Sequence, residues 1–203
     1  MKPLIHVVDD DESLRESLLD LLHAAGYDAC GYGSTGAFLL HPLPERPACL
    51  LLDVRLPGPS GLELQEALRR RGLALPIVFL TGHADVPMTV RAVKGGAVDV
   101  LEKPVSRERL LRAIDAALAG DAQARAAHQA QAQRDARLAS LTAREREVFD
   151  RVVAGQRNQA IADALGIGLR TVKAHRAQLM AKLGVATAAE LGRLAGETED
   201  RSG

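Results

Sequence analysis

Acidic side chains directly follow two apolar segments in the first half of the 203-residue chain. Asp9 and Asp10 come after the run at 4–8, and Asp53 comes after the run at 48–52. If these runs are parallel strands, their carboxyl ends meet at one edge of a sheet and bring the three carboxylates together. Clustered carboxylates repel one another unless they share a cation, and Mg²⁺ or Mn²⁺ prefers oxygen ligands. The sequence therefore predicts a divalent-metal site.

Two more polar side chains end apolar runs later in the same segment. Thr81 follows the run at 77–80 and offers a hydroxyl, and Lys103 closely follows the run at 98–101 and offers a positive charge. This set suits transfer of a phosphoryl group to a carboxylate, because the metal and the lysine neutralise charge on the transferring oxygens. Asp53 is the expected nucleophile, since the apolar run before it makes it the most deeply placed carboxylate.

The expected metal ligands are Asp10, Asp53 and the main-chain carbonyl of Arg55, with Asp9 acting through water. Each residue also has a simpler explanation. Asp9 and Asp10 could favour a helix N-terminus through the macrodipole, and the other strand-end side chains could cap loops or face solvent. Four strand ends that carry Asp-Asp, Asp, Thr and Lys in this order would rarely arise by chance, so we favour the functional interpretation.

Apolar runs alternate with helical spacing through residues 1–118. Besides the four runs above, a weaker strand candidate lies at 27–31, and Leu14, Leu18 and Leu21 follow helical spacing. This alternation predicts a parallel sheet with helices on both faces. Five such units in about 118 residues predict an α/β flavodoxin-like (βα)5 domain.

Composition excludes several classes of protein. Aromatic residues make up 2% of the chain and Trp is absent, so base stacking on an aromatic platform is a poor hypothesis. No apolar run is long enough to cross a bilayer, which predicts a cytoplasmic protein without a membrane partner. The only cysteines, Cys30 and Cys49, have no metal-ligand spacing, and we expect both to be buried and reduced.

The zero net charge of the chain hides an asymmetry. Residues 1–119 carry 13 Lys and Arg against 16 Asp and Glu, a net charge of −3, whereas residues 120–203 carry 13 against 10, a net charge of +3. The basic half could meet a polyanion. Between the halves, residues 119–139 are rich in Ala, Gln and Arg and predict a solvated helical linker without a coiled-coil seam.

Residues 140–196 predict a small all-α domain of four short helices, followed by a frayed tail at 197–203. Thr142 with Glu145, and Thr187 with Glu190, fit the capping box that begins a helix. Three glycines stand where helices are expected to end, at Gly155, Gly166 and Gly184.

A basic segment within this domain favours nucleic acid. Residues 164–186 carry four cationic side chains and no carboxylate, at Arg170, Lys173, Arg176 and Lys182. The turn at 166–168 opens a helix whose first residues would meet base edges if it lay in a major groove. The simpler alternative is that these side chains form an ordinary solvated helix face. We favour it less, because the basic helix directly follows a turn between two short helices.

The first half resembles the receiver domain of two-component response regulators, most closely the FixJ-like branch. The resemblance spans residues 3 to 118 and is carried by Val7-Val8-Asp9-Asp10, Asp53-Val54-Arg55-Leu56-Pro57, Thr81-Gly82-His83 and Glu102-Lys103-Pro104. It implies a receiver domain at 1–118 that uses Mg²⁺, takes a phosphoryl group onto Asp53 from a sensor histidine kinase, and moves the Thr81 hydroxyl onto the phosphate. It also implies a cis peptide bond at Lys103-Pro104.

One position departs from the receiver pattern. Val100 stands where the family usually has Phe or Tyr, and a valine cannot swing between an exposed and an inward position as that aromatic ring does. The receiver should still accept phosphate, but the helix expected near Val86–Lys94 would have to move without an aromatic partner.

A segment of about 55 residues in the second half resembles the LuxR-type helix-turn-helix. The matching stretches are 141–145, 158–162, 170–176 and 182–184. The resemblance implies that Lys173 and Ala174 face the bases, and that phosphate contacts come from Arg170, Thr171, Arg176 and Lys182. It also implies a dimer contact through the last helix, at 187–194. Gly168 and Ala160 replace residues common in the family, which predicts a weaker cap on the recognition helix.

Together these features predict a response regulator, not an enzyme. Its expected partners are a sensor histidine kinase, double-stranded promoter DNA, a second copy of the chain after phosphorylation, and RNA polymerase. One alternative is an aspartyl-phosphate phosphatase, which would want a carboxylate where Arg55 stands. The other is a DNA-binding regulator whose receiver is a phosphorylation-independent dimerisation module, an idea that Val100 supports.

Overall fold

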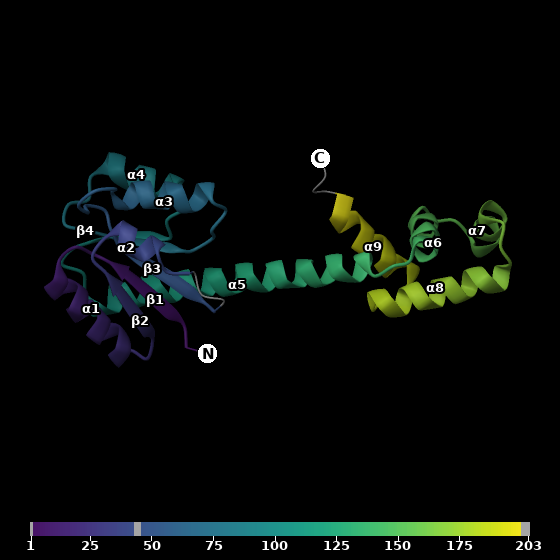
Figure 1. The fold of residues 1–203 in the computed structure, drawn as a ribbon, viewed down its shortest axis with the longest axis horizontal. Helices are drawn as coiled ribbons and strands as arrows, with labels where there is room; N and C mark the ends of the chain where they lie inside the picture. Colours follow the sequence, from purple (N-terminus) through teal and green to yellow (C-terminus); the bar gives the residue numbers. More distant parts are fainter. Residues whose placement is uncertain (1, 43–45, 200–203) are drawn as a thin grey trace. The chain divides into compact units, whose positions relative to one another are not determined.

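The computed structural model describes residues 2–42 and 46–199. The chain forms two compact units, which divide between Ala126 and Ala127. The first unit is built on a five-stranded parallel sheet (Figure 1). Its strands lie in the order β2-β1-β3-β4-β5. They are β1 (Leu4–Val8), β2 (Asp28–Tyr32), β3 (Ala48–Asp53), β4 (Ile77–Thr81) and β5 (Asp99–Glu102). The predicted flavodoxin-like fold is confirmed.

Helices cover both faces of this sheet. They are α1 (Glu12–Ala24), α2 (Thr35–Leu39), α3 (Gly61–Arg70), α4 (Val86–Lys94) and α5 (Arg107–Ala139). On one face, Phe38 of α2 and Leu64 of α3 pack on β1, β3 and β4. On the other, Leu22 of α1 and Ile114 of α5 pack on the same strands. Because the central strands are covered on both sides, their side chains are buried throughout, which explains the continuous apolar runs.

Side-chain caps fix where several of these helices begin. Asp11 accepts a hydrogen bond from the Leu14 amide at 3.0 Å, and Asp85 accepts one from the Met88 amide at 2.7 Å. Ser60 and Glu63 form a capping box at the start of α3. The loops that follow β1, β3 and β4 are therefore short and anchored, and these loops surround the carboxyl edge of the sheet.

Helix α5 runs without interruption from Arg107 through the segment predicted as a linker. Its middle is still tied to the sheet, because the buried carboxylate of Asp121 accepts a hydrogen bond from the Ala48 amide at 3.0 Å. Arg125 pairs with the same carboxylate at 2.7 Å. The contacts of the first unit thus continue beyond residue 118, while the division at 118 and 139 stays a prediction.

The second unit contains four helices that follow the end of α5. They are α6 (Ala143–Val153), α7 (Asn158–Leu165), α8 (Leu169–Leu183) and α9 (Ala188–Glu199). Both predicted capping boxes are present, at Thr142 with Glu145 and at Thr187 with Glu190. Gly166 and Gly184 end helices in the left-handed conformation, as expected. Helix α9 extends further than predicted, and residues 200–203 of the predicted frayed tail lie outside the described residues.

The prediction for the two cysteines is half wrong. Cys49 is buried in the central strand β3, but Cys30 is exposed. Cys30 lies on β2, which pairs with β1 alone and so forms an edge of the sheet. An edge strand has a neighbour on one side only, and its side chains are correspondingly less covered. Among the described residues, no helix is both long and apolar enough to cross a membrane.

Candidate functional site

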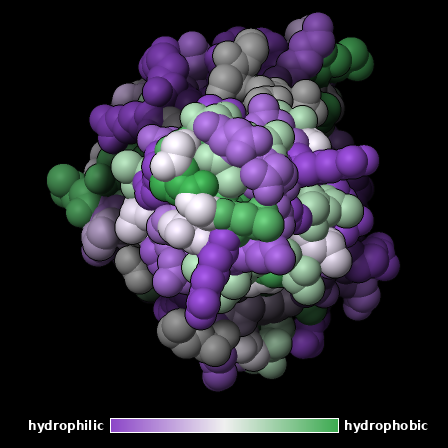
Figure 2. Space-filling model, turned by 90° about the vertical axis from the view of Figure 1, so that its right-hand side faces the viewer, coloured by the Kyte–Doolittle hydropathy of each residue, from purple (hydrophilic) through white to green (hydrophobic). Residues whose placement is uncertain are grey.

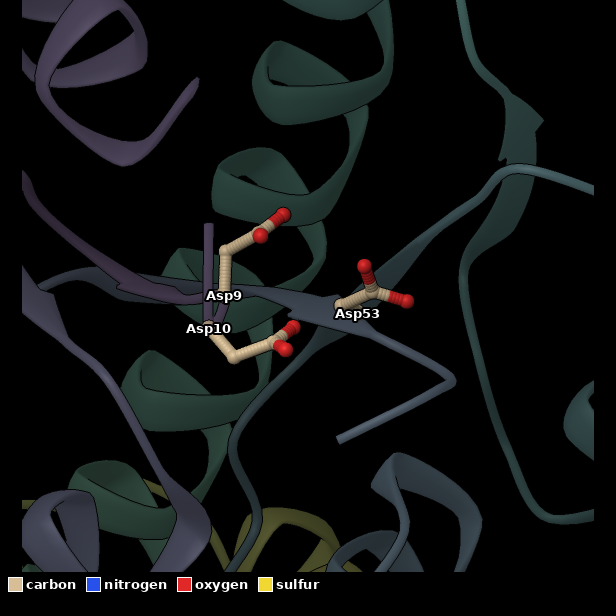
Figure 3. A group of neighbouring side chains, drawn as sticks. All are labelled: Asp9, Asp10 and Asp53. Atoms are coloured by element: carbon tan, nitrogen blue, oxygen red, sulfur yellow. The ribbon is translucent and has the colours of Figure 1, made fainter. Parts of the chain in front are cut away.

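The three predicted carboxylates meet at the carboxyl edge of the sheet (Figure 3). Asp9 and Asp10 follow β1, and Asp53 is the last residue of β3. Each contributes an oxygen to a group in which all such atoms lie within 4.8 Å of one another. Asp9 and Asp53 are buried, at 1% and 8% exposure, whereas Asp10 is exposed. Water therefore screens the negative charges of Asp9 and Asp53 poorly, whereas the carboxylate of Asp10 faces solvent.

Lys103 balances the two buried carboxylates. Its Nζ lies 2.7 Å from Asp9 Oδ2 and 2.6 Å from Asp53 Oδ2. Burial opposes the charged ammonium, but its hydrogen bonds to Asp53 and Asp9 outweigh this effect and raise the pKa of Lys103. The Lys103-Pro104 peptide bond is cis, as expected. The lysine therefore remains a fixed positive charge between the two carboxylates.

Main-chain amides hold the other oxygens of the same two carboxylates. The Asp11 amide donates to Asp9 Oδ1 at 3.0 Å, and the Arg55 amide donates to Asp53 Oδ1 at 2.8 Å. The Arg15 guanidinium also donates to the main-chain oxygen of Asp9 at 2.8 Å. The sequence does not predict this contact of Arg15, because an arginine near the start of a helix carries no signal that it bonds to the preceding loop. The site is built from both side chains and loop backbone.

Thr81 is fully buried at the end of β4, beside the site. Its hydroxyl donates to the His83 main-chain oxygen at 3.0 Å and accepts from the His83 amide at 3.3 Å. The hydroxyl is therefore engaged with its own loop in this structure. Val100, at the position expected to be aromatic, is half-buried and packs in the core cluster that contains Phe79. Its short side chain adds no ring to the surface between α4 and β5.

The donor set fits a hard divalent cation. The three carboxylates offer oxygen atoms only, and their mutual approach places several negative charges in a small space. Mg²⁺ and Mn²⁺ take carboxylate, carbonyl and water oxygens, and Mg²⁺ typically uses one or two carboxylates together with water. Exposed Asp10 and buried Asp53 can supply such ligands. The identity of a bound ion stays a prediction.

The predicted DNA-contact residues lie on α8, in the second unit. Arg170, Thr171, Lys173 and Ala174 are all exposed on its first turns. Arg176 is half-buried, and its guanidinium donates to Asn158 Oδ1 at 2.6 Å. Gly168 is the N-cap and provides no side-chain hydrogen bond, as the sequence predicted. These residues form a basic patch at the N-terminal part of the helix.

Figure 2 looks onto the side of the second unit where α7 meets the start of α8. Hydrophilic and hydrophobic residues are intermixed on this face, and hydrophobic ones lie near its centre. Leu169, at the start of α8, is 39% exposed. The exposed basic residues on the first turns of α8 are typical of a surface that contacts a nucleic-acid backbone.

Lys182 lies apart from the other predicted DNA contacts, in the last turn of α8. Its Nζ is 2.6 Å from Glu145 Oε2 and 3.3 Å from the Ser140 main-chain oxygen. Glu145 is buried, and its hydrogen bond with Lys182, followed by that from the Thr142 amide, lowers its pKa to about 2. The ammonium therefore ties α8 to the start of α6, and its contact with phosphate stays a prediction.

The fold and the two sites define a class of protein: a flavodoxin-like unit with a carboxylate cluster at its strand ends, followed by a small helical unit with a basic helix. Comparison with known proteins identifies both parts. Residues 5–115 match the response regulator receiver domain, and residues 139–195 match the luxR family of bacterial regulatory proteins. The chain belongs to the two-component response regulators with a LuxR-type DNA-binding domain. It is a transcription regulator and not an enzyme, so the phosphatase alternative is rejected.

Several full-length relatives share this organisation. The chain is 42% identical to nodulation protein W of Bradyrhizobium diazoefficiens, over 95% of this chain and 85% of that one. It is 41% identical to FixJ of Azorhizobium caulinodans, over 94% and 90%. It is 44% identical to the C4-dicarboxylate transport regulator DctR of Rhodobacter capsulatus, over 94% and 98%.

Solved structures agree with this assignment. The response regulator StyR matches with a TM-score of 0.90 and 45% identity, covering 97% of this chain and all of that one. Full-length FixJ from B. japonicum matches with a TM-score of 0.57 and 40% identity, covering 95% of each chain.

Proposed function

We propose that Asp53 accepts a phosphoryl group from a sensor histidine kinase. A carboxylate oxygen of Asp53 attacks the phosphorus of a phosphohistidine, the P–N bond breaks, and the imidazole leaves with its electron pair and takes up a proton. The product is an acyl phosphate on Asp53. Support comes from the placement of Asp53 at the strand end, with one oxygen held by the Arg55 amide and the other by Lys103.

The residues around Asp53 can neutralise the transferred group. Lys103 carries a positive charge within reach of the Asp53 carboxylate, and the Thr81 hydroxyl can exchange its bond to His83 for one to a phosphoryl oxygen. The ligands we propose for Mg²⁺ or Mn²⁺ are Asp10, Asp53 and the Arg55 main-chain carbonyl, with Asp9 acting through water. When bound, the ion would offset negative charge on the phosphoryl oxygens.

The single observation that carries this proposal is the bridge from Lys103 to two buried carboxylates of a predicted metal site. The test is incubation of the full chain with a low-molecular-weight phosphodonor and Mg²⁺, followed by intact-mass measurement. We expect the mass of one phosphoryl group on the wild-type chain and none on Asp53→Asn. Equal labelling of both chains would reject Asp53 as the acceptor.

We further propose that phosphorylation promotes dimers through the surface of α4 and β5. Exposed valines recur along α4 at Val86, Val90 and Val93, with Val98 just before β5. Their spacing places the α4 side chains on one stripe, which a second copy of the chain could cover. In the second unit, α9 is the proposed dimer contact.

The dimer would present two copies of α8 to double-stranded promoter DNA. In this proposal Lys173 and Ala174 face the bases, and Arg170, Thr171, Arg176 and Lys182 contact phosphates. The DNA-bound dimer would then contact RNA polymerase. In this proposal the protein acts in the cytoplasm, where the kinase and the promoter are also accessible.

A second candidate is a receiver that only dimerises, independently of phosphate. Val100 favours it, because the aromatic relay expected between Thr81 and the α4 surface has no ring here. Operator affinity and oligomeric state, measured for wild type and Asp53→Asn with and without phosphodonor, separate the two. A phosphodonor effect on wild type alone supports the switch, and identical behaviour of both chains supports the dimerisation module.

A further inference from the structure

A second polar site lies between α3 and α4, helices that run side by side over one face of the sheet (Figure 1). A cavity of about 250 Å³ opens there. Its lining consists of Leu62, Gln65, Glu66, Arg69, Arg91, Lys94 and Gly95. Both helices run antiparallel to the strands, so their C-terminal ends lie at the edge of the sheet opposite Asp53. None of the lining residues belongs to the carboxylate cluster of Asp9, Asp10 and Asp53.

The charges around this cavity are mainly positive. Arg69, Arg91 and Lys94 line it, and within the described part of the chain none of these three side chains forms an ion pair or a hydrogen bond. Glu66 is the one carboxylate of the lining, and it already pairs with Arg70 at 3.0 Å. Arg91 also attracts Glu63, which lies outside the lining. Three cationic groups against the one, already paired carboxylate of the lining favour an anion with more than one negative charge.

The floor of the cavity is built from a buried amide. Gln65 is 5% exposed, and its Nε2 donates to the Ala92 main-chain oxygen at 2.9 Å, which pins α3 to α4. A β carbon at Gly95 would lie 2.4 Å from Gln65 Oε1, so only glycine leaves room for this amide. The floor is thus preorganised, and a bound group would meet a fixed polar surface beneath exposed cations.

From this arrangement we propose that the cavity binds a small polyanion that carries carboxylate or phosphate groups. Its volume suits a compact molecule, since drug-sized ligands occupy roughly 300 to 1,000 Å³. The simpler explanation is that cations in the last turns of α3 and α4 only offset the helix dipoles. That explanation assigns the same role to Arg70, which lies in the last turn of α3 but does not line the cavity.

A ligand in this position would act on α4. Because Gln65 already joins the two helices, an anion held by Arg69 on α3 and by Arg91 and Lys94 on α4 would resist any movement of α4 relative to α3. If phosphorylation moves α4, the two events must then influence each other's free energy equally. The cavity is already present in the unphosphorylated chain, so binding can be tested without phosphorylation.

The experiment is an NMR titration of the full chain without divalent metal. The probes are citrate and pyrophosphate, which distinguish carboxylate from phosphate groups, and acetate at matched ionic strength is the monovalent control. We expect saturable shifts of the Gln65 side-chain amide and the Gly95 amide with at least one polyanion. The double variant Arg91→Gln, Lys94→Gln should bind at least about tenfold more weakly.

Arg71→Gln is the matched control, because Arg71 is the C-cap residue of α3, does not line the cavity and, unlike Arg70, does not pair with Glu66 of the lining. We expect its affinity to stay within about twofold of wild type, since exposed charges elsewhere contribute little. Asp53→Asn should also bind like wild type, which keeps this result independent of the proposed phosphotransfer. Equal weakening by Arg71→Gln, shifts confined to α8, or no saturable shift at Gln65 and Gly95 would overturn the proposal.

Discussion

Gly61 packs directly against the main-chain carbonyl oxygen of Asp53. A β carbon at Gly61 would lie 2.3 Å from that oxygen, and also 3.0 Å from Leu52 Cγ. Gly61 is the first residue of α3, and its amide donates to the Val54 main-chain oxygen at 3.1 Å. The start of α3 and the end of β3 thus fix each other, so the proposed phosphoacceptor is positioned by helix packing as well as by its strand.

Gly61→Ala should therefore displace the end of β3. We expect a loss of about 1 to 3 kcal/mol in the free energy of unfolding, because an extra methyl in a packed site forces the backbone to shift. Phosphoryl uptake should slow by roughly tenfold or more, since small misplacements of a reacting group are costly. Urea unfolding and the rate of labelling by a phosphodonor measure the two effects. Gly120→Ala, at an open position in α5, is the control and should not slow labelling.

The Asp121 carboxylate is expected to hold α5 to the sheet. Asp121→Ala would leave the fully buried Ala48 amide without its acceptor, at a cost of about 1 to 3 kcal/mol. Asp121→Asn keeps an acceptor oxygen and should recover most of that loss. Hydrogen exchange of β3 amides reports on the first unit alone. If both variants exchange like wild type, Asp121 does not tie the helix to the sheet.

The second unit should lose stability in acid through Glu145. The pKa of this carboxyl lies at about 2 in the fold, below its ordinary 4.5, chiefly because of Lys182 and then the Thr142 amide. A lowered pKa stabilises the fold above pH 4.5, and that stabilisation disappears as the pH falls toward 2. Hydrogen exchange of α6 amides across this range should show the loss. In Glu145→Gln the same pH dependence should be smaller.

Helix α8 can be given a better cap. Gly168 has extended backbone and no positive φ, and a β carbon there would meet only Thr171 Oγ1, at 3.9 Å. Gly168→Ser should raise the stability of the second unit by a few tenths of a kcal/mol, roughly the difference between these N-caps. Thermal unfolding measures the gain. A lower melting temperature would mean that the new side chain disturbs the turn after α7.

Lys173 offers a test of base reading. If it contacts a base, Lys173→Ala should cost about 1 to 3 kcal/mol in operator binding and relax preference at one base pair. Affinities for operators altered at single positions measure this preference. A uniform loss over all sequences would assign Lys173 to phosphate instead. Arg170→Ala is the comparison, for which we expect a uniform loss and a weaker salt dependence.

Much of the fold followed from local patterns. The buried strands β1, β3 and β4 appear as short apolar runs, and the capping boxes at Thr142 and Thr187 mark helix starts because their chemistry is confined to a few residues. Short α2 was not predicted, since its five residues are too few to show helical periodicity. The prediction that Cys30 is buried is wrong, because the residues of β2 do not themselves indicate that this strand lies at an edge of the sheet.

The sequence by itself determined the residue types and the strand ends that carry them: Asp9, Asp10, Asp53, Thr81 and Lys103. Only the tertiary structure decided which of them touch. It placed Lys103 between Asp9 and Asp53, turned the Thr81 hydroxyl to His83, and used Lys182 to hold Glu145. The physical reason is that residue type and strand register are local properties, whereas side-chain partners depend on how distant segments pack.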